Sequence, residues 1–165
     1  MKRPLLLVLF GLAFGFVEAV VVLYLRSWFG MDTMDPPQAI VLLNLGVIAF
    51  LSPSTVILPN ATVATVEMVR EAATIIMLVT VAALASNSFR QWIGAFLVAF
   101  AVWDLGYYFF LWILLGWPKS VLDPDIFFLL PVPWAGPVIT PLVLSTALLL
   151  LGFWLFAKEP QGANH

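Results

Sequence analysis

Four long apolar runs dominate this 165-residue chain and constrain its fold more than any other feature. They cover about residues 5–25, 66–86, 92–115 and 135–157, and each is close to the ~20 residues that a helix needs to cross a bilayer. Composition excludes a soluble domain, because 63% of the residues are hydrophobic and only 10% are charged. The sequence therefore predicts an all-α membrane protein, a four-transmembrane-helix bundle that forms one membrane domain over residues 1–165.

The first run could instead be a secretory signal, because Val17-Glu18-Ala19 loosely resembles a cleavage site. The apolar residues continue beyond this point to Leu25, which gives a run of about 21 residues and favours a membrane span.

The stretch from Ala39 to Leu51 is also apolar, but it is short for a span. Prolines at positions 36, 37, 53 and 59 bracket it and would end helices there. We expect an interfacial or re-entrant segment within the first outer connection, residues 27–65. The sequence alone does not decide between these two forms and a fifth span.

The basic residues predict the orientation of the four spans. Cytoplasmic connections carry an excess of Lys and Arg, and this rule places both termini on the cytoplasmic side. The inner side then holds Lys2, Arg3, Arg90 and Lys158, and the outer half holds Arg26, Arg70 and Lys119.

The second outer connection, residues 116–134, is rich in proline and contains the apolar run Ile126 to Leu130. We interpret it as a lid or collar on the outer face of the bundle. The alternative is an interfacial loop with no role beyond packing.

Several kinds of chemistry are excluded by composition. The chain has no cysteine, so disulfides, thiolate metal sites and thiol catalysis cannot occur. Its one histidine, His165, is the last residue, which removes the usual ligands of haem, zinc and copper. A net charge of −2 without a basic patch argues against nucleic-acid binding. We assign no metal ligands, and both the cofactor, if one is bound, and whether the protein is an enzyme stay open.

Five charged residues lie within the expected spans, where each costs roughly 2.5–3.5 kcal/mol on insertion scales. From a rise of 1.5 Å per residue, the carboxylates of three helices fall in one outer slab, about 9 to 16 Å below the surface. The five residues are Glu18, Glu67, Arg70, Glu71 and Asp104.

Helical spacing also places these groups on inward faces. Gly11 and Gly15 share a stripe with Glu18, and such small residues let helices approach closely. Arg70 can pair with Glu67 one turn away or with a carboxylate on another helix. The phenols Tyr107 and Tyr108 follow Asp104 by one turn and could donate hydrogen bonds to it.

Each of these features also has a structural interpretation. Glu67 could merely complement a helix dipole, Arg70 and Glu71 could form a structural salt bridge, and the two tyrosines could be core aromatics. The convergence of the charges on one slab favours a ligand- or ion-binding site, made of Glu18, Glu67, Arg70, Glu71, Asp104, Tyr107 and Tyr108.

Three uses of such a site are open. Carboxylates without imidazole suit hard cations, buried carboxylates suit proton relay, and an arginine could clamp an anionic headgroup or a lipid-like ligand. The alternative function is a structural or accessory subunit of a membrane complex, in which the buried charges serve helix packing only. The expected partners are the lipid bilayer and a further membrane protein or a second copy of the chain.

The chain also resembles a family of small, uncharacterised bacterial membrane proteins with four spans. The resemblance covers most of the chain outside residues 27–65 and implies a location in the bacterial inner membrane, without implying an activity. It rests on the stretches 16–26 (FVEAVVVLYLR), 70–74 (REAAT), 103–108 (WDLGYY), 115–118 (LGWP) and 130–137 (LPVPWAGP).

Overall fold

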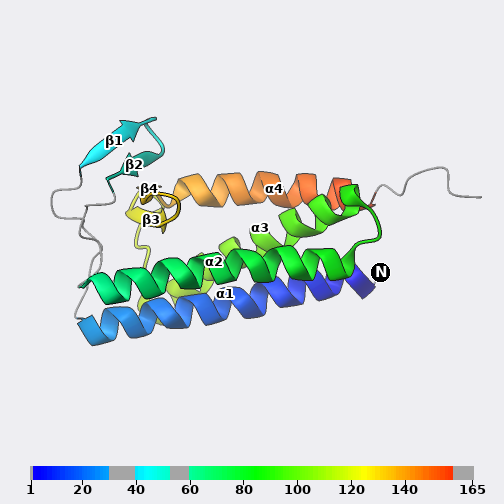
Figure 1. The fold of residues 1–165 in the computed structure, drawn as a ribbon, viewed down its shortest axis with the longest axis horizontal. Helices are drawn as coiled ribbons and strands as arrows, with labels where there is room; N and C mark the ends of the chain where they lie inside the picture. The colour runs from blue at the N-terminus through cyan, green and yellow to red at the C-terminus, as the bar shows by residue number, and fades with distance from the viewer. Residues whose placement is uncertain (1, 30–39, 53–59, 158–165) are drawn as a thin grey trace, which may run out of the picture.

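The computed structural model describes residues 2–29, 40–52 and 60–157. Four α-helices dominate these parts of the chain, and each is long and apolar enough to cross a membrane. They are α1 (Lys2–Phe29), α2 (Ala61–Ala85), α3 (Phe89–Leu115) and α4 (Ile139–Ala157). Successive helices run in opposite directions, so the start of α1 and the end of α4 lie at the same end of the bundle (Figure 1). The chain is thus a multi-pass membrane protein with four helices, as predicted.

Local signals set the ends of the helices. Asn60 caps α2 by accepting a hydrogen bond from the amide of Val63 at 2.9 Å, and Ser88 caps α3 in the same way. Gly116 ends α3 in a left-handed conformation with φ of 64°, which glycine adopts without steric cost.

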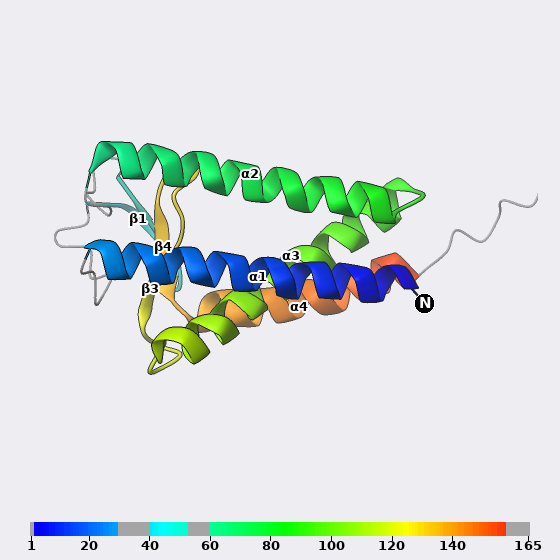
Figure 2. The same cartoon turned by 90° about the horizontal axis from the view of Figure 1, so that it is seen from below.

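Helix α3 crosses the bundle diagonally and contacts the other three helices (Figure 2). Glycines allow the close approach of α1 to α3. A Cβ at Gly15 would lie 2.7 Å from the carbonyl oxygen of Trp103, and one at Gly11 would lie 2.9 Å from the side chain of Val102. Gly94 and Gly152 do the same between α3 and α4, where a Cβ at Gly94 would lie 2.6 Å from the amide of Phe156. These contacts agree with the packing role predicted for Gly11 and Gly15.

The connections at one end of the bundle form a small antiparallel sheet (Figures 1 and 2). Its strands are β1 (Val41–Asn44), β2 (Ala49–Leu51), β3 (Pro124–Phe128) and β4 (Trp134–Pro137), in the spatial order β1-β2-β4-β3. Pairing of Ala49 with Ala135 and of Phe50 with Trp134 joins the two connections into one sheet. We call this end of the molecule the sheet end.

The sheet corrects the sequence-based expectation for residues 39–51, of which Ala39 lies outside the described residues. The described part forms the β1–β2 hairpin and not a fifth membrane-spanning helix, so the fold is not all-α, and an interfacial position of this segment stays a prediction. The turn explains the difference, because the Asn44 side chain accepts from the amide of Gly46 at 2.8 Å and Gly46 takes a φ of 87°. The fourth helix is also displaced: residues 134–137 form β4, and α4 begins at Ile139 rather than near residue 135.

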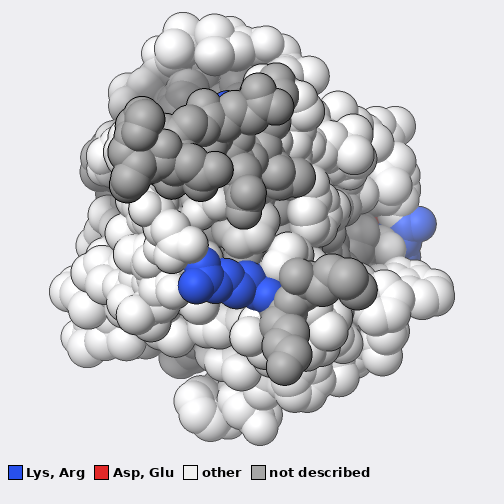
Figure 3. Space-filling model, turned by 90° about the vertical axis from the view of Figure 1, so that its right-hand side faces the viewer, with Lys and Arg blue, Asp and Glu red and all other residues white. Residues whose placement is uncertain are grey.

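The opposite end of the bundle carries basic side chains (Figure 3). The charged side chains described there are those of Arg3 and Arg90. Arg3 approaches the carbonyl of Ala85 at 3.5 Å, and Arg90 lies over the ring of Trp154. The orientation of the two ends across a membrane stays a prediction.

Candidate functional site

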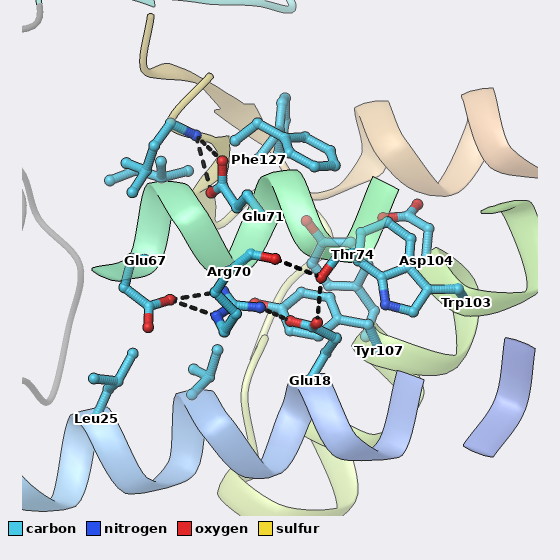
Figure 4. Close-up of a pocket in the computed structure, with 15 residues that line it drawn as sticks. Glu18, Leu25, Glu67, Arg70, Glu71, Thr74, Trp103, Asp104, Tyr107 and Phe127 are labelled. Carbon is cyan, nitrogen blue, oxygen red and sulfur yellow. Dashed lines mark hydrogen bonds and ion pairs between the residues drawn. The ribbon is translucent and has the colours of Figure 1, made fainter. Parts of the chain in front are cut away.

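A pocket of about 90 Å³ lies inside the sheet end, between α1, α2, α3 and the β3–β4 hairpin (Figure 4). Side chains of α1, α2 and α3 line it, and residues 126–129 cover it from the hairpin side. All seven residues singled out from the sequence line this pocket: Glu18, Glu67, Arg70, Glu71, Asp104, Tyr107 and Tyr108.

Arg70 sits between two carboxylates on different helices (Figure 4). It forms an ion pair with Glu18 of α1 and a second one with Glu67 of α2, where Nε and Nη2 donate to Oε2 at 2.8 and 2.7 Å. Thr74 adds a hydrogen bond to Glu18 at 2.9 Å. Both pairings expected for Arg70 are therefore present. Glu67 lies beyond the first turn of α2 and acts through Arg70 rather than as a partner of the helix dipole alone.

Glu71 projects from α2 toward the hairpin instead of toward Arg70 (Figure 4). Both of its carboxylate oxygens accept from the backbone amide of Leu129, at 3.0 and 2.9 Å. This bond is charge-assisted when Glu71 is ionised. Glu71 therefore attaches the hairpin to α2, and the salt bridge considered between Arg70 and Glu71 is not formed among the described residues.

Asp104 connects α3 with α4. The hydroxyl of Ser145, which is buried, donates to Oδ2 of Asp104 at 2.7 Å. The second oxygen, Oδ1, has no hydrogen-bond partner among the described residues. Asp104 is thus held in place by one oxygen and retains a free acceptor beside the pocket.

Tyr108 does not bond Asp104 as the sequence suggested. Its hydroxyl donates to Asp125 of β3 at 2.7 Å, which links α3 to the hairpin. Asp125 is only 4% exposed, and this burial raises its pKa to about 6, against the opposing effect of the Tyr108 hydrogen bond. The tyrosine therefore fixes the hairpin over the pocket, together with Glu71.

Two hydrogen-bond donors in the pocket wall have no acceptor in the part of the chain that is described. The indole Nε1 of Trp103 is buried and unpaired, and the hydroxyl of Tyr107 is unpaired as well. An unpaired buried donor costs about 1–3 kcal/mol. A pocket of about 90 Å³ has room for a few water molecules or a small polar group that could accept these bonds.

The pocket is strongly acidic. Four carboxylates and one guanidinium line it, which leaves an excess of three formal negative charges. Within the described residues, however, no three acidic or histidine side chains are grouped closely enough to hold a metal ion.

Two residues that hydrogen-bond side chains of this site, Asp125 and Ser145, were not singled out from the sequence. Asp125 lies in a connection whose fold was not anticipated, so nothing local pointed to its pairing with Tyr108. Ser145 had a detectable signal, because the pair Ser145-Thr146 interrupts an otherwise apolar run.

The chain was compared with protein-family models, with curated proteins and with solved structures, and none of these comparisons finds a match. The family resemblance noted from the sequence therefore stays a prediction. The structure itself shows a membrane protein with four membrane-length helices and a pocket lined by buried charged residues.

Proposed function

We propose that this protein binds a small positively charged ligand, a proton or a small cation, in the pocket at its sheet end. The observation that carries the proposal is the excess of carboxylates over guanidinium groups in a partly enclosed space. Charges at membrane depth persist where something offsets their cost. Arg70 compensates one of the four formal negative charges, and a bound positive charge would compensate one more.

The residues divide into two groups by their contacts. Glu18, Arg70, Glu67 and Thr74 hold α1 against α2, and Glu67 uses only its Oε2 in these contacts. Asp104 keeps a free oxygen and is the group we expect to bind the ligand. The unpaired donors of Trp103 and Tyr107 would hold water molecules around it.

We place the protein in a bacterial inner membrane, with both termini in the cytoplasm and the pocket in the outer half. The basic side chains of Arg3 and Arg90 at the end opposite the sheet support this orientation. The β3–β4 hairpin then acts as the lid on the outer side of the pocket.

The test is binding of named cations to the purified full chain in nanodiscs. Isothermal titration calorimetry with sodium, potassium and methylammonium chloride measures cation binding. Choline chloride serves as the control, because choline is too large for the pocket. The difference between the potentiometric titrations of wild type and Asp104→Asn measures proton binding. We expect Asp104→Asn to weaken cation binding at least about tenfold, or to remove one titrating proton, while thermal stability changes little.

The matched control is Asp123→Asn, which removes a carboxylate at the same end without touching the pocket. Asp123 accepts hydrogen bonds from the backbone amides of Lys119 and Ser120, and it does not line the cavity. If the wild type binds no cation and its titration equals that of Asp104→Asn, the proposal is wrong.

A second candidate function is that of an accessory subunit. It is favoured by the apolar side chains of the β1–β2 hairpin, which are about half exposed. These are Ile40, Val41, Leu42, Leu43, Leu45 and Val47. Under this function, Leu42→Ser with Leu43→Ser would release a co-purifying membrane protein, and Asp104→Asn would alter stability alone.

A further inference from the structure

A second cavity of about 340 Å³ lies beside the pocket, between the ends of α1 and α2. We call it the α1–α2 groove. Its walls are almost entirely apolar and include Tyr24 and Trp28 of α1 and Val63 and Val66 of α2. Its volume falls in the range of small-molecule sites. The groove could therefore hold an apolar chain, which the smaller acidic pocket could not.

The groove opens onto exposed side chains of α1 and α2, which we expect to face lipid. The side chain of Trp28 is 76% exposed and that of Val66 is 59% exposed. Tyr24 stacks on Trp28 with ring centroids 5.9 Å apart, which makes a flat aromatic wall. A molecule dissolved in the membrane would reach the groove sideways, without passing the β3–β4 hairpin.

The groove and the acidic pocket meet at two shared residues, Leu25 and Glu67. Glu67 is the one charged residue in the groove wall. It therefore marks the point at which an apolar chain in the groove would give way to a polar head in the pocket.

Glu67 has a free acceptor at this junction. Both bonds from Arg70 go to its Oε2, and Oε1 has no partner among the described residues. Figure 4 shows this second oxygen turned away from Arg70, toward the α1 side where Leu25 lies. A hydrogen-bond donor arriving from the groove would meet Oε1 first.

We propose that the groove and the pocket together bind a single-chain amphiphile with a primary ammonium head. The chain lies against Trp28 and Val66, and the ammonium group donates to Oε1 of Glu67. This inference deepens the proposed function, because it names the class of cation that the acidic pocket accepts. A carboxylate or phosphate head is disfavoured, since the excess charge of the pocket is negative and Arg70 is already paired with Glu18 and Glu67.

The test uses hexadecylamine with a nitroxide on its chain as the probe. The nitroxide quenches tryptophan fluorescence at short range, and the difference between wild type and Trp28→Phe isolates the signal from the groove. We expect saturable quenching of Trp28 by the amine in the detergent-solubilised full chain. The matching nitroxide fatty acid and fatty alcohol should bind at least about tenfold more weakly.

Two variants make the test specific. Glu67→Gln should abolish the preference for the amine, whereas Asp123→Asn at the same end should keep it. Val66→Phe fills part of the groove without adding a tryptophan, so it should reduce Trp28 quenching and leave binding of methylammonium through Asp104 intact. That result separates the groove from the pocket.

Equal quenching by amine, acid and alcohol, or an amine preference that survives Glu67→Gln, would overturn the inference. The groove would then be an ordinary lipid-facing surface. A wild type that prefers the amine through Glu67 but shows no binding at Asp104 would support the groove site and overturn the proposed cation site alone.

Discussion

The guanidinium of Arg70 on α2 is paired with the carboxylate of Glu18 on α1, across the interface of two helices that otherwise touch little. Glu67 holds the same guanidinium from the other side. The carboxylate side chains are only 7% and 10% exposed, so these ion pairs are largely removed from solvent. Breaking a buried pair from one side leaves a charge without compensation, and this costs more than the pair itself contributes.

Arg70→Met should therefore lower the free energy of unfolding by about 3 kcal/mol. Unfolding of the detergent-solubilised protein, followed by the circular dichroism of its helices, measures this. The variant that also carries Glu18→Gln and Glu67→Gln should recover most of the loss, because it buries no unpaired charge. A triple variant as unstable as the single one would show that the pairing does not explain the effect.

The close contact of α1 with α3 predicts contrasting effects for two glycines. In Gly15→Ala the new Cβ would lie 2.7 Å from the oxygen of Trp103 and 2.8 Å from the amide of Tyr107, so the backbones must separate. We expect a loss of about 1–3 kcal/mol in the free energy of unfolding. In Gly106→Ala, the matched control, the nearest atom is 3.5 Å away, on the flexible side chain of Leu12. This substitution should be neutral or slightly stabilising, and equal losses in both would refute the packing argument.

The buried carboxyl of Asp125 predicts that stability falls as the pH rises. Its pKa of about 6 lies above the ordinary value of 3.8, so between these pH values the unfolded chain releases a proton that the folded chain keeps. Stability from this group is fully present below about pH 4 and lost above about pH 6, a change on the order of 3 kcal/mol.

Melting temperatures of wild type and Asp125→Asn across this pH range check the prediction, because other titrating groups cancel in the difference. The wild type should lose stability relative to the variant as the pH rises. A constant difference from pH 4 to pH 7 would show that Asp125 does not titrate in this range.

The absence of cysteine makes the orientation directly measurable, since any introduced thiol is the only one. Asn87→Cys places a thiol between α2 and α3, and Leu122→Cys places one at the sheet end. In intact cells, a membrane-impermeant maleimide should label the second and spare the first until the membrane is permeabilised. The reverse pattern would invert the proposed topology.

Much of the helical fold could be predicted from the sequence, because a membrane-spanning helix is a local property of about 20 residues. The shared depth of Glu18, Glu71 and Asp104 could also be derived, since antiparallel helices with a fixed rise bring distant positions level. The structure brings these residues into one pocket.

The sheet could not be derived in the same way. Its hairpin turn at Asn44 and Gly46 was a readable signal, but the pairing of Ala49 with Ala135 joins residues that no local pattern relates. The same reason explains why Tyr108 was expected to bond Asp104: the true acceptor, Asp125, belongs to a strand whose position depends on that pairing.

The pairing of β2 with β4 has a consequence for the order of assembly. Helix α1 precedes β2 in the chain, and β4 directly precedes the last helix, α4. During synthesis the N-terminal part of a chain emerges first, so α1, α2 and α3 are made before residues 134–137 exist. The strand that closes the sheet arrives only with the final helix. The helices that line the acidic pocket, and residues 126–129 that cover it, are thus made before the strand that pairs with β3.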